Sequence, residues 1–225
     1  MAELSMMHLA SSGGASEPTL SELVSTLKDG SKARSRWTAA DALGQMGSNA
    51  GSAVPNLIAA LEDRDQDVRI SVARALGHIG EAAAPALPKL SAALSDRDSG
   101  MRWGAAQALG NLAKVAGPLA ADLVKALADD EEDVRSAAAT ALGQMAQLGV
   151  SMPPTIGDDL TKLLLDEEWH VRRAAADALG RCGAAAFGAL TALEKSRIDP
   201  HPRVARTAQA AVEKIREQAV ALHLF

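Results

Sequence analysis

The chain has 225 residues, a formal net charge of -5 and a pI near 5.5. This acidic balance disfavours a nucleic-acid-binding protein, because such proteins carry net or clustered positive charge. A single cysteine, Cys182, excludes an intrachain disulfide and any CxxC metal or redox motif, and its apolar register position predicts inert core packing.

Residues 1–16 end in a Ser/Gly-rich stretch, which predicts a flexible N-terminal arm. No basic segment precedes an apolar run there, and no Arg-rich transit-like segment follows, so we do not expect secretion. These features favour an intracellular, cytoplasmic location, with an organelle as the alternative. The uncharged run at 136–157 contains Pro153, Pro154 and three glycines. We interpret it as helix, turn and helix start, and expect no membrane insertion.

One pattern repeats from residue 17 onward, and its clearest copy is Asp-Val-Arg-Ile-Ser-Val-Ala-Arg-Ala-Leu-Gly at 67–77. We take the residue before the first Arg of the pattern as a register mark. The marks fall at Ser35, Val68, Met101, Val134, Val171 and a degenerate Val204, with spacings of 33, 33, 33, 37 and 33 residues. A period of this length is typical of stacked supersecondary units.

We therefore predict an all-α solenoid over residues 17–217. Its six units lie at approximately 17–47, 48–80, 81–113, 114–147, 148–183 and 184–217, and an apolar helix extension follows at 218–225. The four extra residues between the fourth and fifth marks, around 148–154, predict a bulge or a shift of the stack there.

Each unit begins with apolar residues at spacings of three and four, as in Leu20, Leu23, Val24 and Leu27, which predicts a first helix with one buried face. A short acidic turn follows, and its carboxylates are expected to cap the second helix. The second helix carries the repeated pattern, with small Ala pairs and an Ala-Leu-Gly that predict close helix packing. Gly47, Gly80 and Gly183 then end it in the manner of a left-handed αL cap.

At these residues the chain resembles the HEAT repeats, specifically the short class found in phycobilin lyase subunits. The pattern Asp-x-Asp-x-x-Val-Arg-x-x-Ala-Ala-x-Ala-Leu-Gly of that class is close to residues 63–77. The resemblance implies a right-handed α-solenoid with the second helices on its concave face. It also implies a structural ladder of hydrogen bonds from unit to unit, made by Arg36, Arg69, Arg102, Arg135 and Arg172 with Asp63, Asp96, Asp129 and Asp166.

We find no catalytic constellation and expect neither a metal nor a cofactor. The five histidines are scattered, none is followed by Glu, and HExxH, Walker and GxSxG motifs are absent. The carboxylates lie at repeated turn positions and are interpreted as helix caps.

The residues that differ most between units fall on the face of the second helix opposite the core, at offsets -2, -1, +2, +3, +6 and +10 from the mark. All three tryptophans belong to this set. The predicted partner-binding residues are Trp37, Asp41, Ile70, Arg74, His78, Trp103, Gln107, Asn111, Gln144, Trp169, His170, Arg173, Asp177 and Arg181.

Because Trp and Arg are frequent anchors of protein interfaces, we predict a non-catalytic scaffold or assembly subunit that binds a protein segment along the concave face. Trp37, Ile70 and Trp103 share the +2 offset and are expected to form an apolar row, with Trp103 removable without loss of stability. The alternative, implied by the resemblance alone, is a bilin-handling subunit in which His170, Arg173 and Arg181 near Trp169 hold a tetrapyrrole.

Overall fold

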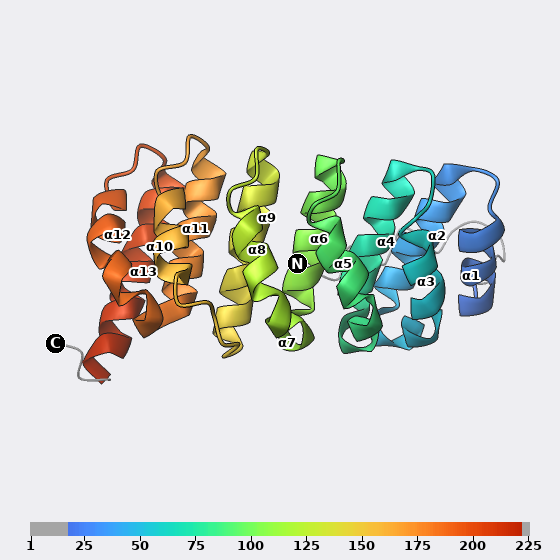
Figure 1. Cartoon of the computed structure of the whole chain (residues 1–225), viewed down its shortest axis with the longest axis horizontal. Coiled ribbons are helices and arrows are strands. Elements are labelled where there is room, and N and C mark those ends of the chain that lie inside the picture. Colours follow the sequence, from blue (N-terminus) through green and yellow to red (C-terminus); the bar gives the residue numbers. More distant parts are fainter. Residues whose placement is uncertain (1–17, 222–225) are drawn as a thin grey trace, which may run out of the picture.

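The computed structural model describes residues 18–221, which are helices and short connections with no β-strand in that range. Figure 1 shows the helices side by side along the long axis of the molecule, in the order of the chain. Six consecutive helix pairs fill the described range. The fold is therefore the all-α solenoid that the repeat period predicts. None of these helices is both long and apolar enough to span a membrane.

Each pair has a shorter first helix and a longer second helix. The first helices are α1 (Leu20–Asp29), α3 (Val54–Ala60), α5 (Leu87–Ala93), α8 (Ala120–Ala126), α10 (Ile156–Leu163) and α12 (Leu190–Ser196). The second helices are α2 (Ala33–Gln45), α4 (Gln66–Ile79), α6 (Ser99–Asn111), α9 (Glu132–Gln147), α11 (Trp169–Cys182) and α13 (Pro202–Ala221). Between pairs lie the 3₁₀ helices η1 (Gly47–Ala53), η2 (Gly80–Ala86), η3 (Gly117–Leu119) and η4 (Gly183–Ala189), with the one-turn helix α7 (Ala113–Ala116) before η3.

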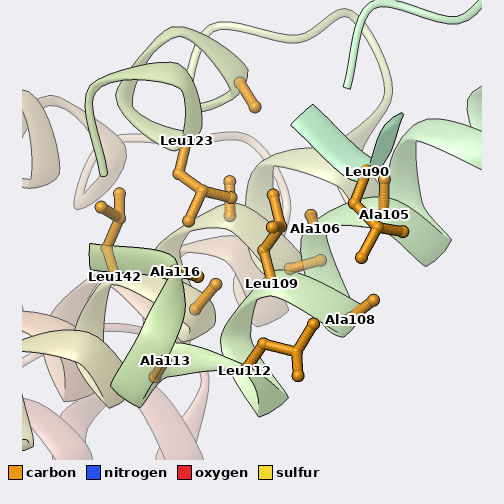
Figure 2. Packing of buried hydrophobic residues seen from close by; sticks show 14 of the residues in the cluster. Leu90, Ala105, Ala106, Ala108, Leu109, Leu112, Ala113, Ala116, Leu123 and Leu142 are labelled. Atoms are coloured by element: carbon orange, nitrogen blue, oxygen red, sulfur yellow. The ribbon is translucent and has the colours of Figure 1, made fainter. Parts of the chain in front are cut away.

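One leucine from the first helix and one from the Ala-Leu-Gly of the second are fully buried in nearly every unit. Leu90 and Leu109 supply them in the third pair, and Leu123 and Leu142 in the fourth. Figure 2 shows these four side chains with the small alanines around them. First helices of 7 to 10 residues are too short to be stable alone in water, so this shared core holds them in place.

The Ala-Leu-Gly glycines allow neighbouring second helices to approach closely. A Cβ placed on Gly77 would lie 2.9 Å from the Cα of Ala108 in the next unit, and one on Gly44 would lie 2.9 Å from the Cα of Ala75. Because those contacts are to backbone atoms, no side-chain rotation can relieve them. The predicted close-packing role of these glycines is confirmed.

Arg–Asp ion pairs join four of the five unit junctions in the described residues. Arg102 donates from Nε to Oδ2 and from Nη2 to Oδ1 of Asp129, both at 2.7 Å, and from Nη1 to the Asp96 carbonyl at 3.1 Å. The equivalent pairs are Arg36–Asp63, Arg135–Asp166 and Arg172–Asp199. The last pair adds Asp199, which the predicted ladder did not include.

The predicted pair of Arg69 with Asp96 is wrong. Arg69 donates to the carbonyl of Asp63 at 2.9 Å, as the other ladder arginines do within their own unit, but no ion pair joins it to Asp96 in the described residues. Asp96 accepts from the backbone N–H of Asp98 at 2.9 Å, a bond that the paired ladder aspartates make as well. No neighbouring contact accounts for the missing bond, and the second and third units are joined instead by packing and by an ion pair between Lys89 of α5 and Glu62.

The ladder fixes the charge of its carboxylates. The hydrogen bond from Arg36 holds the pKa of Asp63 below its ordinary value, against the opposing effect of burial. Arg172 lowers the pKa of Asp199 in the same way. These carboxylates therefore stay ionised, and remain hydrogen-bonded to the next unit, well into acidic solution.

The helix caps predicted from the sequence form at some helix ends and not at others. Asp65 and Asp98 cap α4 and α6 through their side chains, as predicted, but Glu131 and Glu168 make no such bond at α9 and α11. The glycines after the second helices have positive φ, yet Gly80 (φ 78°, ψ -148°) is extended and not αL. The expected αL cap is therefore wrong at Gly80 and at Gly183 (φ 59°, ψ -131°), because the chain leaves α4 and α11 directly into η2 and η4.

The four extra residues between the fourth and fifth units lie in the connection after α9, where Gly149 has a φ of 75°. Val150 and Met152 from this segment pack against the core. Arg135 still reaches Asp166 at 2.7 Å across this junction. The insertion is therefore absorbed at the edge opposite the ladder, and the expected shift of the stack does not extend to the ladder edge.

The last helix, α13, buries Val204, Ala208, Val212, Ile215 and Ala219 against the fifth unit and its own first helix. The side chain of Gln218 accepts a hydrogen bond from the backbone of Ala184 at 3.2 Å. This part of the predicted extension packs back onto the stack. The predicted N-terminal arm, 1–16, and residues 222–225 lie outside the described residues.

Candidate functional site

The candidate site lies on the face formed by the second helices, which we call the second-helix face. Side chains at the +2 offset reach toward the following unit. Ile70 shows this most clearly, since its Cδ1 is 2.8 Å from where a Cβ on Gly100 would be. Trp37 and Trp103, at the same offset, are half-buried and pack partly against the core. Truncating Trp103 therefore removes core packing as well, contrary to the expectation that stability would be unaffected.

A hollow of about 370 Å³ opens on this face over the third to fifth units. Its walls come from three second helices: Trp103, Gln107 and Asn111 of α6, Asp133, Ser136, Thr140 and Gln144 of α9, and Arg173 of α11. Ala137 and Ala141 also line it. The hollow exists because Ser136 stands at +2 in the fourth unit, between the larger Trp103 and Arg173. The structure thus brings together five predicted residues with Thr140, at the +6 offset of the same face, and adds Asp133 and Ser136.

The remaining predicted residues lie elsewhere on this face. Arg74 and His78 of the second unit are exposed, and Asp41 of the first unit is half-buried. Asp177 and Arg181 of the fifth unit bind each other, with Nε of Arg181 donating to Asp177 Oδ2 at 2.8 Å. Arg181 also donates to Oε1 of Gln147 at 2.7 Å, so its charge is used within the protein.

Trp169 does not join the row of tryptophans. It is the first residue of α11, and its ring stacks on His201 with centroids 4.0 Å apart and planes 6° apart. The guanidinium of Arg203 lies 5.8 Å from the centre of the same ring. Trp169 is therefore a packing residue between the fifth and sixth units, because the turn before α13 brings His201 over its face.

His170, next to it, is half-buried, and its Nε2 makes no hydrogen bond in the described residues. The nearest acidic atom is Oδ1 of Asp133, 3.7 Å away. The side chain of Asp133 is 77 % exposed, so its carboxylate faces the hollow and solvent. With Trp169 and Arg181 already engaged, the cluster predicted to hold a tetrapyrrole offers Arg173 as its one exposed cation.

A second surface was missed by the sequence reasoning. Leu165 and Ile198 are each 87 % exposed and line an apolar hollow of about 470 Å³ between α10 and α12. Both residues stand immediately before a ladder aspartate, where earlier units carry Glu62, Ser95 and Ala128. That change from polar or small residues to large apolar ones was a signal in the sequence.

Neither a reactive thiol nor a metal site accompanies these surfaces. Cys182 is half-buried, and burial raises the pKa of its thiol to about 11, so it stays protonated and inert at neutral pH. In the described part of the chain, no group of three His, Cys, Asp or Glu side chains is arranged to hold a metal ion.

Comparison with protein families gives one match, which covers most of the chain. A model described as HEAT repeats matches residues 20–110, 54–143 and 120–213, so the overlapping matches together extend from 20 to 213. No curated protein sequence matches the chain.

Solved structures of engineered repeat proteins are similar in fold. An engineered protein solved by a structural genomics consortium is 26 % identical with a TM-score of 0.70, over 89 % of this chain and 98 % of that one. A designed armadillo repeat protein in complex with the peptide (KR)4 is 22 % identical with a TM-score of 0.69, over 88 % and 100 %. A structure of computationally designed armadillo repeat proteins for modular peptide recognition is 24 % identical with a TM-score of 0.64, over 87 % of this chain and 99 % of that one.

Proposed function

Since the chain belongs to the HEAT-repeat family, we propose that it is a non-catalytic interaction protein that binds a segment of a protein partner along its second-helix face. The observation that carries this proposal is the hollow between Trp103 and Arg173. Its polar lining residues, such as Gln107, Asn111 and Thr140, belong neither to the core nor to the ladder, so the architecture does not require them.

The lining favours a polypeptide as the occupant. Gln107, Asn111 and Gln144 carry amide groups that both donate and accept hydrogen bonds, which is what a peptide backbone needs. Trp103 supplies an apolar anchor beside them. An apolar centre with a polar surround is the usual composition of a protein interface.

The extent of the face supports a segment over a small molecule. The hollow receives residues from three successive second helices, and the +2 row continues beyond it to Ile70 and Trp37. A bound chain can follow that row from unit to unit. The designed armadillo repeat protein with a bound peptide has the same kind of helical stack, which supports the proposal at the level of the fold.

The hollow is poorly equipped for catalysis. It contains the hydroxyls of Ser136 and Thr140, but no His, Cys or Lys lines it to activate one of them as a nucleophile. We therefore place the function in binding.

Two matched arginine substitutions test the proposal. Thr140→Arg fills the hollow from an exposed position on α9, and Ala121→Arg adds the same charge at an exposed position on α8, a first helix. Affinity capture followed by mass spectrometry should recover a partner with the wild type and with Ala121→Arg, and lose it with Thr140→Arg. A partner that Thr140→Arg retains, with equal melting temperatures for all three proteins, would place the binding surface elsewhere.

The bilin alternative has less support on this face. Of the residues predicted to hold a tetrapyrrole, Trp169 is stacked on His201 and Arg181 is bound to Asp177 and Gln147. A tetrapyrrole would have to displace those contacts to use either group. Titrating the protein with a free bilin tests this directly, because a shift of the bilin absorbance band that disappears in Arg173→Ala would favour the alternative.

A further inference from the structure

Two tryptophans on the second-helix face are matched by aspartates on the following unit. Ile70, at the +2 offset, lies against Gly100, the -1 residue of the next unit. At this pair of offsets the chain has Trp37 with Asp67 and Trp103 with Asp133. Trp103 and Asp133 line the same hollow.

The other unit junctions carry different pairs: Ile70 with Gly100, Ser136 with His170, and Arg173 with Arg203. A carboxylate thus follows each tryptophan of the row, and none follows the other three residues. An acidic residue in the first turn of a helix is favourable by itself. That preference does not explain the pairing, because α6 and α11 have no acidic residue in their first turn.

We propose that each tryptophan–aspartate pair receives a Lys or Arg side chain, so that the partner segment carries two basic residues. This inference rests on the proposed function. An indole face attracts a cation, and a neighbouring carboxylate adds a charge-assisted hydrogen bond. Both groups are open at Trp103, since no cation lies over that ring in the described residues and Asp133 is 77 % exposed.

The carboxylate of Asp133 is not used within the protein. Its nearest basic atom is Nε2 of His170 at 3.7 Å, beyond hydrogen-bond distance. By contrast, the third tryptophan, Trp169, already has Arg203 beside its ring and His201 stacked on it. The fold therefore supplies Trp169 with an internal cation and leaves the positions at Trp37 and Trp103 for an external one.

The spacing of the two pairs sets the spacing of the basic residues. The pairs are two units apart, and packed helix pairs repeat at about 10 Å, which separates the sites by roughly 20 Å. An extended chain advances about 3.3 Å per residue, so the two basic residues should be about six positions apart. A third basic residue, two units further along the row, would meet the exposed guanidinium of Arg173 and be repelled.

Three labelled peptides test the inference by fluorescence anisotropy. They share an Ala/Ser/Gly background and carry Lys, Glu or Ser at two positions about six residues apart. The Lys peptide should bind and the Glu and Ser peptides should not. Asp133→Asn and Asp67→Asn should each weaken the Lys peptide about tenfold, the worth of one charge-assisted hydrogen bond. Asp158→Asn, an exposed change on α10, is the matched control and should have no effect.

Failure of this inference can be told from failure of the proposed function. Binding of the Glu or Ser peptide that Thr140→Arg abolishes would overturn the basic class and keep the face as a peptide site. No binding of the Lys peptide, or binding that Asp133→Asn and Asp67→Asn leave unchanged, would also overturn it. The proposed function itself would still be decided by the capture experiment with Thr140→Arg and Ala121→Arg.

Discussion

Replacing one ladder arginine with alanine should destabilise the stack strongly, and Arg102 and Arg69 offer a matched comparison. Both arginines occupy the same position in adjacent units, and both donate to a backbone carbonyl of their own unit. Arg102 alone also binds two aspartates of the next unit, Asp129 and Asp130, and makes a long second contact to the Arg97 carbonyl. The difference between the two alanine variants therefore reports chiefly on the inter-unit ion pairs.

The structure sets the magnitude. The side chains of Arg102 and Asp129 are only 12 % and 10 % exposed, so the pair is largely removed from water. Arg102→Ala leaves the Asp129 carboxylate buried with the backbone N–H of Glu131, at 3.0 Å, as its remaining hydrogen-bond donor. Breaking a buried pair from one side costs about 3–5 kcal/mol, and the lower end applies because a tenth of each side chain still meets solvent.

Arg69→Ala removes one hydrogen bond to the Asp63 carbonyl, which is worth about 1 kcal/mol. Urea unfolding followed by far-ultraviolet circular dichroism measures both variants. The expected gap between them is about 2 kcal/mol in the free energy of unfolding. A folded stack of this size has about 5–15 kcal/mol in total, so both proteins should remain folded.

Equal losses for the two variants would refute the assignment of Arg102 to the inter-unit ladder, as would a loss below about 1 kcal/mol for Arg102→Ala. The unfolding slope must be compared as well. A central unit that uncouples from its neighbours would broaden the transition, because repeat stacks are held together by nearest-neighbour contacts.

Three further outcomes are expected. Gly77→Ala should cost about 1–3 kcal/mol, since its Cβ would lie 2.9 Å from backbone of the next second helix, whereas Gly188→Ala meets no atom within 4 Å and should be neutral in the same melt. The ladder holds the pKa of Asp63 below its ordinary value, so its stabilisation should be complete above about pH 4 and be lost as the pH falls through the lowered pKa; a melting temperature that rises on acidification would contradict this. Leu165→Ser and Ile198→Ser should change the free energy of unfolding by less than about 0.5 kcal/mol, because both side chains are 87 % exposed, and a larger loss in calorimetry would show that they are buried in solution.

The repeat architecture could be predicted from the sequence because its causes recur at fixed separations along the chain. Arg36–Asp63, Arg102–Asp129 and Arg172–Asp199 each join residues 27 positions apart. Each Ala-Leu-Gly glycine likewise meets an alanine of the next second helix, as Gly77 meets Ala108. A contact that recurs once per unit requires the same residue types at the same position of each unit. Comparing the units within one chain therefore reveals it.

The candidate site could be predicted only in part. The +2, +6 and +10 offsets located Trp103, Gln107 and Asn111 on one wall of the hollow, since a helix of fixed pitch determines which residues share a face. The opposite wall was only partly anticipated. Asp133 and Ser136 drew no attention in the sequence, because an acidic residue and a small residue at the start of a helix are ordinary in isolation.

The sequence by itself determined the helix pairs, their order and most of the ladder, because each depends on one unit and its immediate neighbour. The tertiary structure decided what lies between the units. It left Arg69 without Asp96, stacked Trp169 on His201, and opened a hollow where Ser136 stands between Trp103 and Arg173. These outcomes follow from side-chain size and direction in two or three neighbouring units at once, and no single copy of the repeat contains that information.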